Sequence, residues 1–252
     1  MLRLTEIELW PQKDIRLYSS SGSVMHGALM DCVDEVTAAI LHTESLRPYS
    51  QYVWFDKARG CSIWRIGTVT DEAYERIVQP IWHCTDLYLK QKQTPVALKH
   101  HVLIEHTTFE DIADTMFAGK EAPTGCDISF LTTTSFKHDH RYDIFPEIRR
   151  VFYSLILRWN QYADAIVLDQ EGLEDILAQS CRITKYELRS QPFSLEHTSI
   201  YGFGGTLRLR FLGNDMTRRL MGLLLSLAPY TGIGVKTAMG MGAVQMHLQY
   251  MK

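Results

Sequence analysis

The chain has 252 residues, of which 46% are hydrophobic and 22% charged, and these proportions exclude a disordered or fibrous protein. Its length allows one large domain or two domains of roughly 100–150 residues each. No apolar run approaches the roughly 20 residues of a membrane helix, and the first residues lack the apolar core of a signal peptide. We therefore expect no membrane contact and a cytoplasmic location.

The formal net charge of −3 argues mildly against a nucleic-acid partner, but the charge is unevenly distributed. Residues 182–252 hold nine Lys and Arg against three Asp and Glu, whereas residues 1–181 hold 17 against 26. This asymmetry predicts an anion-binding surface in the last quarter of the chain, although a solvated face would give the same counts.

The five cysteines are widely spaced, and no two of them form a C-x-x-C motif. This argues against a disulfide framework or a zinc knuckle and predicts reduced cysteines in the core. They are Cys32, Cys61, Cys84, Cys126 and Cys181.

The first half of the chain predicts the order β-α-β-β-α-β. Apolar residues at three- and four-residue spacing predict one helix over residues 24–41. An acidic first turn predicts a second helix that begins at residue 71. Alternating or apolar runs predict the strands at residues 2–10, 50–56, 61–69 and 96–106.

A Gly/Pro break at residues 118–125 predicts a boundary between two domains, residues 1–122 and residues 123–252. The second half repeats the order β-α-β-β-α-β with one extra helix. Its predicted helices begin near residues 146, 171 and 215, and its strands cover residues 126–136, 184–193, 202–213 and 243–250. We predict an α+β protein with two tandem ferredoxin-like (RRM-like) domains, each with an antiparallel sheet.

The stretch "YTGIGVKTAMGMGAVQ" contains four glycines, Gly232, Gly234, Gly240 and Gly242, with Lys236 between the two pairs. Glycine lets backbone N–H groups approach a charged ligand and adopts positive φ without cost. The dinucleotide fingerprint fails because Thr237 replaces the third glycine, and the Walker A spacing fails because Val235 precedes the lysine. A phosphate cradle and a tight connection between a helix and a strand both remain open.

Three stretches resemble the CRISPR-associated endoribonucleases of the RAMP superfamily, which cut precursor CRISPR RNA within its repeats. The first is "TTTSFKHDHRYDIFPEIRRVFYSLILRWN", in which Thr133 replaces the usual proline. The second joins "GFGGTLRLRF" to "LLLSLAPYTGIGVKTAMGMGAVQ". The third runs from "HGALMDCV" to "AAILHTESLRPYS", where the family's first helix ends in Leu-His.

The resemblance implies tandem ferredoxin-like domains and metal-independent cutting of repeat RNA. In the reaction that the resemblance implies, the 2′-OH attacks the phosphorus and leaves a 2′,3′-cyclic phosphate and a 5′-OH. The resemblance places His42 at the catalytic position and Arg47 as the cation that stabilises the phosphorane. It implies that the glycines cradle RNA phosphates with Lys236. A helix cap is the alternative for His42, and a solvated surface cation is the alternative for Arg47.

For RNA contact we further predict Lys137, beside "TSF", and Arg208 with Arg210, which alternate on one face of a strand. His26 is a weaker candidate. It lies sixteen residues before His42, about four and a half turns on one helix, so we expect no direct pairing between the two.

We predict no cofactor and no metal, because the dense histidines around His138 and His140 lack further ligands at a fixed spacing. Repeat RNA is the predicted partner, with a CRISPR effector complex as a further one, and the protein is a monomer or a homodimer. Two other functions remain open: a non-catalytic RNA-binding subunit of such a complex, and a tandem ferredoxin-like module that binds a small anion.

Overall fold

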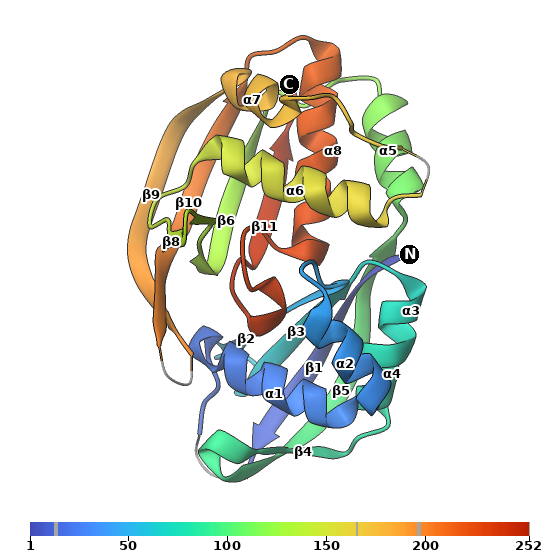
Figure 1. Ribbon diagram of the computed structural model, residues 1–252, viewed down its shortest axis with the longest axis vertical. Coiled ribbons are helices and arrows are strands. Elements are labelled where there is room, and N and C mark those ends of the chain that lie inside the picture. The colour runs from blue at the N-terminus through green and yellow to red at the C-terminus, as the bar shows by residue number, and fades with distance from the viewer. Residues whose placement is uncertain (13–14, 165, 196–197, 252) are drawn as a thin grey trace.

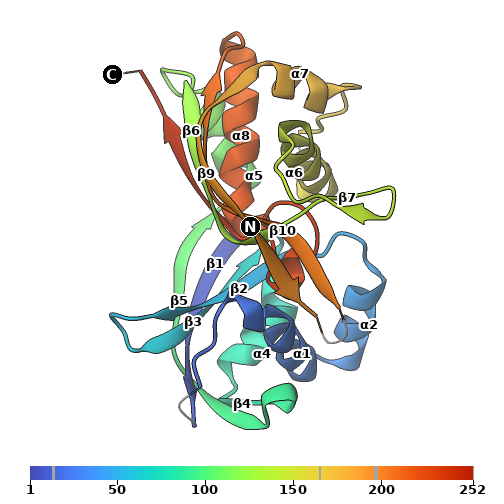
Figure 2. The ribbon, with the colours of Figure 1, turned by 90° about the vertical axis from the view of Figure 1, so that its left-hand side faces the viewer.

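The computed structural model describes residues 1–12, 15–164, 166–195 and 198–251, and it forms two lobes stacked along the long axis (Figure 1). Each lobe is an antiparallel sheet with helices packed on it, as the side view also shows (Figure 2). Within these described ranges, no helix combines the length and the apolar character that crossing a membrane requires.

The N-terminal lobe is a five-stranded sheet in the order β2-β3-β1-β5-β4. Strands β2, β3, β1 and β5 have the ferredoxin-like arrangement, and β4 extends the edge beside β5. The strands are β1 Leu2–Pro11, β2 Tyr49–Asp56, β3 Cys61–Thr68, β4 Asp86–Leu89 and β5 Thr94–Thr107. The helices are η1 Ser19–Ser21, α1 Gly22–Cys32, α2 Glu35–Thr43, α3 Asp71–Ala73, the π-helix η2 Tyr74–Val78, α4 Gln79–Trp82 and η3 Lys90–Lys92.

The C-terminal lobe is a four-stranded sheet in the order β11-β6-β10-β9, the same arrangement as in the first lobe. The predicted tandem ferredoxin-like fold is thus confirmed. The strands are β6 Gly125–Thr134, β9 Cys181–Ser194, β10 Ser199–Phe211 and β11 Val244–Gln249, with a small hairpin of β7 Lys137–His138 and β8 Arg141–Tyr142. The helices are α5 Phe109–Phe117, α6 Ile148–Tyr162, α7 Leu173–Gln179, α8 Asp215–Thr231 and η4 Thr237–Met239.

The single helix predicted over residues 24–41 is wrong, because the chain breaks between α1 and α2. Val33 is extended, with φ −89° and ψ 157°, and ends α1. Asp34 then caps α2, and its side chain accepts a hydrogen bond from the backbone N–H of Thr37 at 2.9 Å. An Asp N-cap is a strong start signal, and here it outweighs the continuous apolar spacing.

The two lobes do not have fully separate cores. One of the two large core clusters lies between the N-terminal sheet and its helices, and it also takes in Ala238 near the end of the chain. The other belongs to the C-terminal lobe, but it also takes in Leu2, Leu4 and Val69 of the first lobe. Helix α5 was not predicted, and it packs its buried face in this second cluster. The predicted boundary at 122/123 falls between α5 and β6 and stays a prediction.

The segment between α8 and β11, residues 232–243 and here called the glycine loop, lies between the lobes (dark red in Figure 1). Its Gly240 packs against the first residue of α1, Gly22. Gln51 of β2 joins the two segments, since its Nε2 donates to the carbonyl oxygens of Gly22 at 2.8 Å and Ala238 at 3.2 Å. The indole N–H of Trp64 donates a hydrogen bond to the Oε1 atom of Gln51 at 2.8 Å.

All five cysteines are free, in agreement with the sequence analysis. Cys61 and Cys126 are buried, whereas the other three are half-buried. The expectation of core positions therefore holds fully for two of them.

The contact between α1 and the glycine loop leaves no room for a side chain. A Cβ on Gly22 would lie 2.5 Å from the Met239 carbonyl oxygen and 2.9 Å from the Cα of Gly240. We expect Gly22→Ala to lower the free energy of unfolding by about 1–3 kcal/mol. In the same helix, Gly27 has no atom within 4 Å of an added Cβ, so Gly27→Ala should raise it by up to about 1 kcal/mol. Urea denaturation tests both, and equal effects would contradict this packing.

Candidate active site

The centre of the candidate site is a hydrogen bond between His26 of α1 and Tyr49 of β2. The Tyr49 hydroxyl lies 2.8 Å from His26 Nδ1. Both side chains are buried, with exposed fractions of 9% for His26 and 1% for Tyr49. The imidazole is therefore fixed from inside the protein, with only its outer edge left for a ligand.

His42 lines the same groove as His26. Because α2 starts anew after Asp34, its last turn carries His42 back beside α1, and both histidines line one groove with Asp31, Tyr88 and Lys90. The expectation that the two histidines lie far apart on one helix is therefore wrong. His42 is exposed, as a residue that exchanges protons with a substrate needs to be.

The surroundings of His26 disfavour its charged form. Burial, and then the positive charges of Arg47, His42 and Lys236, lower the pKa of His26 to about 4. His26 is thus neutral at pH 7. Arg47 and Lys236, which were predicted from separate stretches of the sequence, therefore both lie near this histidine.

Arg47, Lys137 and Lys236 come together in a second pocket beside the histidine groove. Arg47 follows α2 and donates from Nε to the Leu41 carbonyl oxygen at 2.6 Å. Burial, followed by the charges of Arg47 and Lys137, lowers the pKa of Lys236. None of the three cations forms an ion pair with a carboxylate among the residues that the structure describes. The pocket is also lined by the buried Arg158 and by Glu44. We refer to Arg47, Lys137 and Lys236 as the three-cation pocket.

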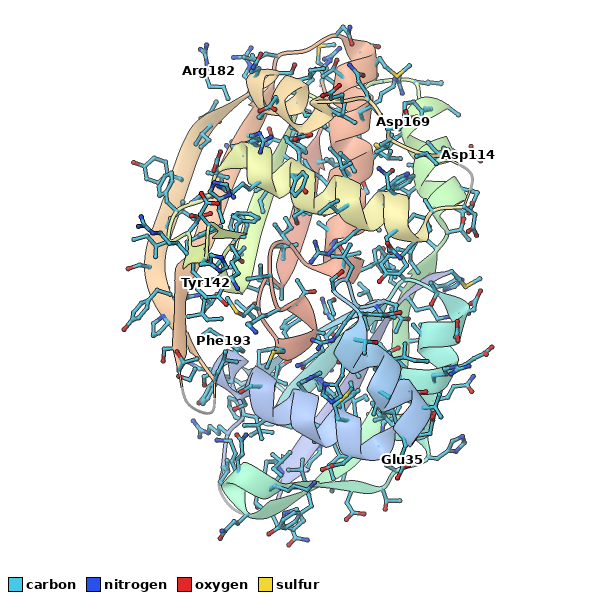
Figure 3. All side chains as sticks on the ribbon, in the orientation of Figure 1. Glu35, Asp114, Tyr142, Asp169, Arg182 and Phe193 are labelled. Carbon is cyan, nitrogen blue, oxygen red and sulfur yellow. The ribbon has the colours of Figure 1, made fainter. Side chains whose placement is uncertain are left out.

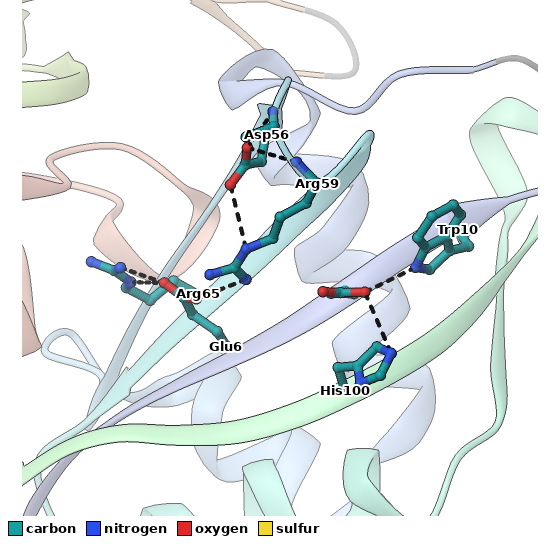
Figure 4. Close-up of polar contacts among 8 residues, drawn as sticks. Glu6, Trp10, Asp56, Arg59, Arg65 and His100 are labelled. Carbon is teal, nitrogen blue, oxygen red and sulfur yellow. Dashed lines mark hydrogen bonds and ion pairs between the residues drawn. The ribbon is translucent and has the colours of Figure 1, made fainter.

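Several cations elsewhere on the surface are paired with carboxylates. On the outer face of the N-terminal sheet, Arg59 lies 3.4 Å from Glu6 and 3.5 Å from Asp56, and Arg65 donates to the same Glu6 (Figure 4). Arg47, Lys137 and Lys236 differ from these paired cations, because they share one pocket and none of them forms an ion pair among the described residues. Like charges that are held together favour binding of an anion.

The glycine loop is held by Arg158, a residue of α6 that the sequence analysis did not single out. Its guanidinium is buried and donates to the Gly234 carbonyl oxygen at 2.7 Å and to the Ser154 carbonyl oxygen at 2.8 Å. Burial lowers its pKa to about 10, so it stays charged at neutral pH.

The four glycines are structural. Each has a positive φ, between 68° and 101°, and each is buried. Their N–H groups all bond within the protein: to the Ala228, Thr237 and Thr133 carbonyl oxygens and to Ser154 Oγ. The prediction that these N–H groups cradle phosphates is therefore corrected. The loop instead presents Lys236, itself at φ 56°, to the pocket; RNA contact by the loop stays a prediction.

Arg208 and Arg210 lie on a different surface. Arg208 forms two bonds to the Asp127 carboxylate, at 2.5 and 2.9 Å, on the exposed face of the C-terminal sheet. Arg210 lies opposite Arg182 in the register of β10 against β9, at the end of β9 that is far from α1 (Figure 3). The structure does not bring these arginines to the histidines, and their predicted RNA contact is a separate hypothesis.

The histidines of the β7–β8 hairpin do not assemble a metal site. His138 Nε2 lies 3.1 Å from Asp139. Over the described ranges, no three His, Cys, Asp or Glu side chains are close enough to share a metal ion. Metal-independent chemistry stays a prediction.

The fold and this site define a class: a tandem ferredoxin-like protein with a buried glycine loop, a histidine pair and a cationic pocket between its lobes. Comparisons with known proteins agree. The profile of the family "CRISPR-associated endoribonuclease Cas6" matches residues 128–244. A Mycobacterium tuberculosis protein of that name is 29% identical over 226 residues, which is 89% of this chain and 71% of the relative. A Streptococcus thermophilus protein of the same name is 26% identical over 221 residues, which is 88% of this chain and 89% of the relative.

Solved structures show the same fold. A Cas6 product complex has a TM-score of 0.80 at 20% identity and covers 98% of this chain and 100% of that one. A Thermus thermophilus Cas6 has a TM-score of 0.74 at 20% identity, with 98% of each chain covered. The resemblance to the Cas6 family of CRISPR-associated endoribonucleases is thus confirmed.

The depressed pKa of His26 makes stability depend on pH. The folded state resists protonation down to about pH 4, whereas an unfolded histidine takes up a proton near 6.5. Stability should therefore fall by up to roughly 3 kcal/mol as pH drops from 6.5 to 4. His26→Gln removes this titration but keeps an acceptor for Tyr49, so it should flatten the profile. Urea unfolding at pH 7.5 and 4.5 tests this; parallel profiles for wild type and His26→Gln would contradict it.

Proposed function

We propose that this protein is a metal-independent endoribonuclease that cuts CRISPR repeat RNA in precursor transcripts. The observation that carries the proposal is the three-cation pocket, which lies beside His26 and His42 and is built from both lobes. A chain of phosphates that crosses this pocket brings one phosphate to the histidine groove. The matches to Cas6 endoribonucleases supply the substrate class.

The reaction needs a base for the 2′-OH proton and an acid for the departing 5′-oxygen. His42 is exposed and lines the groove, so its imidazole can reach a bound RNA and exchange a proton with it. Arg47 and Lys236 bring positive charge to the phosphorane oxygens, where charge builds up in the transition state. His26, which is neutral, is suited to hydrogen bonding rather than to ionic attraction.

Three further features stay predictions from the resemblance: association with a CRISPR effector complex, the choice between monomer and homodimer, and a cytoplasmic location. Cutting by the purified protein alone would separate an enzyme from a non-catalytic RNA-binding subunit. Preference for repeat RNA over ATP in filter binding would separate both from a small-anion module.

Attack by the 2′-OH fixes both the requirements and the products of the cut. Labelled repeat RNA should be cut in EDTA and leave a 2′,3′-cyclic phosphate, or its opened form, upstream and a 5′-OH downstream. A deoxyribose just upstream of the cut should block cutting and spare binding, because only the nucleophile is lost. A requirement for Mg²⁺ with a 5′-phosphate product would reject this mechanism.

His42→Ala should lower the single-turnover rate by about 10²–10⁴-fold with little change in RNA affinity, because a positioned acid or base acts mainly in the transition state. His106→Ala, at an exposed histidine on β5, is the matched control and should cut normally. If His42→Ala protein that is still folded cuts at the wild-type rate, His42 is not the acid or base.

The two cationic surfaces can be compared through salt dependence. Each phosphate contact on single-stranded RNA contributes roughly −0.7 to the slope of log K against log salt concentration. The double variant Lys137→Ala/Lys236→Ala should therefore flatten the slope by about 1.4. Arg208→Ala/Arg210→Ala is the comparison. An unchanged slope in the first variant and a flattened one in the second would move the RNA path to the C-terminal sheet.

A further inference from the structure

The Tyr49 hydroxyl has one hydrogen-bond partner within the described part of the chain, and that partner is His26 Nδ1 at 2.8 Å. The hydroxyl is fully enclosed, because Tyr49 is 1% exposed. The rings of the two residues are also nearly parallel, with centroids 6.4 Å apart and 20° between their planes. Tyr49 thus fixes the imidazole from behind, on the side away from the groove.

The hydrogen of this bond belongs to Tyr49. If Nδ1–H donated to the hydroxyl oxygen, the hydroxyl hydrogen would be buried without an acceptor, a costly arrangement. If the hydroxyl donates to Nδ1, both groups are satisfied. Burial also raises the pKa of Tyr49, so the phenol keeps its proton.

The other ring nitrogen, Nε2, faces the groove. In the described ranges no protein group bonds to it, yet it is not one of the buried side-chain atoms that lack a partner. It therefore reaches the open groove that His26 shares with His42. With Nδ1 serving as an acceptor, the single hydrogen of the neutral ring sits on Nε2.

We propose that Tyr49 is a positioning residue that holds His26 as the neutral Nε2–H tautomer, so that His26 donates a hydrogen bond to a phosphoryl oxygen at the cut. This inference rests on the proposed function and assigns His26 a role different from that of His42. A donor aimed at oxygens that gain charge stabilises the transition state without giving up its proton.

Proton transfer by His26 is disfavoured in both directions. As a base, Nε2 already carries a hydrogen, and a second proton on the ring would face Arg47 and Lys236 in a buried site. As an acid, the neutral ring would become an imidazolate, or Tyr49 would become a buried tyrosinate. The acid–base work therefore falls to His42 and water.

The tautomer can be read directly from the imidazole ¹⁵N shifts of the purified protein at pH 7. We expect His26 to show a protonated Nε2 and an unprotonated, hydrogen-bonded Nδ1. Tyr49→Phe should move both shifts toward intermediate values, because the ring is no longer held in one state. A wild-type His26 with its hydrogen on Nδ1, or with two hydrogens, would overturn the proposal. This measurement needs no RNA, so it is independent of the proposed function.

Substitutions at His26 separate a donor from a proton-transfer group. Gln can accept from Tyr49 through Oε1 and donate through its Nε2, whereas Leu can do neither. In single-turnover cutting we expect His26→Gln to stay within about 10-fold of wild type and His26→Leu to lose about 10²–10³-fold. Equal losses in both variants would show that His26 transfers a proton and would overturn the donor role.

Tyr49→Phe should slow single-turnover cutting roughly five- to tenfold at unchanged RNA affinity, as expected for one lost hydrogen bond. It should also abolish the advantage of His26→Gln over His26→Leu. Tyr52→Phe removes a hydroxyl from the same strand, three residues along, and should cut normally. If Tyr49→Phe cuts as fast as Tyr52→Phe, the positioning role is wrong. If wild type does not cut at all, the proposed function fails, and the ¹⁵N shifts still decide the tautomer.

Discussion

The close contact between Gly22 of α1 and Gly240 of the glycine loop is the constraint on which the site depends. With no Cβ on either residue, the two backbones can touch, and Gln51 bonds to both segments. This contact brings Lys236, near the end of the chain, to a histidine near its beginning. Neither lobe carries the site alone, so the chemistry depends on how the lobes dock.

The site holds groups that would be more stable apart. Lys236 is partly buried beside Arg47 and Lys137, and burial, followed by the charges of these two residues, lowers its pKa. Arg158 is buried, has no carboxylate partner among the residues that the structure describes, and donates to carbonyl oxygens instead. Such arrangements persist where the rest of the fold enforces them, and they are typical of functional sites. An RNA phosphate would supply the missing negative charge.

The alternating strands and the amphipathic helices α6 and α8 could be predicted because hydrophobic periodicity is a local property. His42 and Arg47 could be proposed from the resemblance to the CRISPR-associated endoribonucleases, and Lys236 from the glycine-rich stretch. The break before Asp34 was missed because apolar spacing continues through it. Tyr49 and Arg158 act through partners 23 and 76 residues away, which no local pattern records. The four glycines could be singled out from the sequence, but spacing cannot show whether their N–H groups are already bonded.

The most direct test of this account is an experimental structure with repeat RNA that carries deoxyribose just upstream of the cut. The account predicts that the scissile phosphate lies within hydrogen-bond distance of His26 Nε2, with His42 beside the 2′ position and Lys236 on the phosphate. RNA bound along Arg208 and Arg210, with the histidine groove left empty, would contradict it.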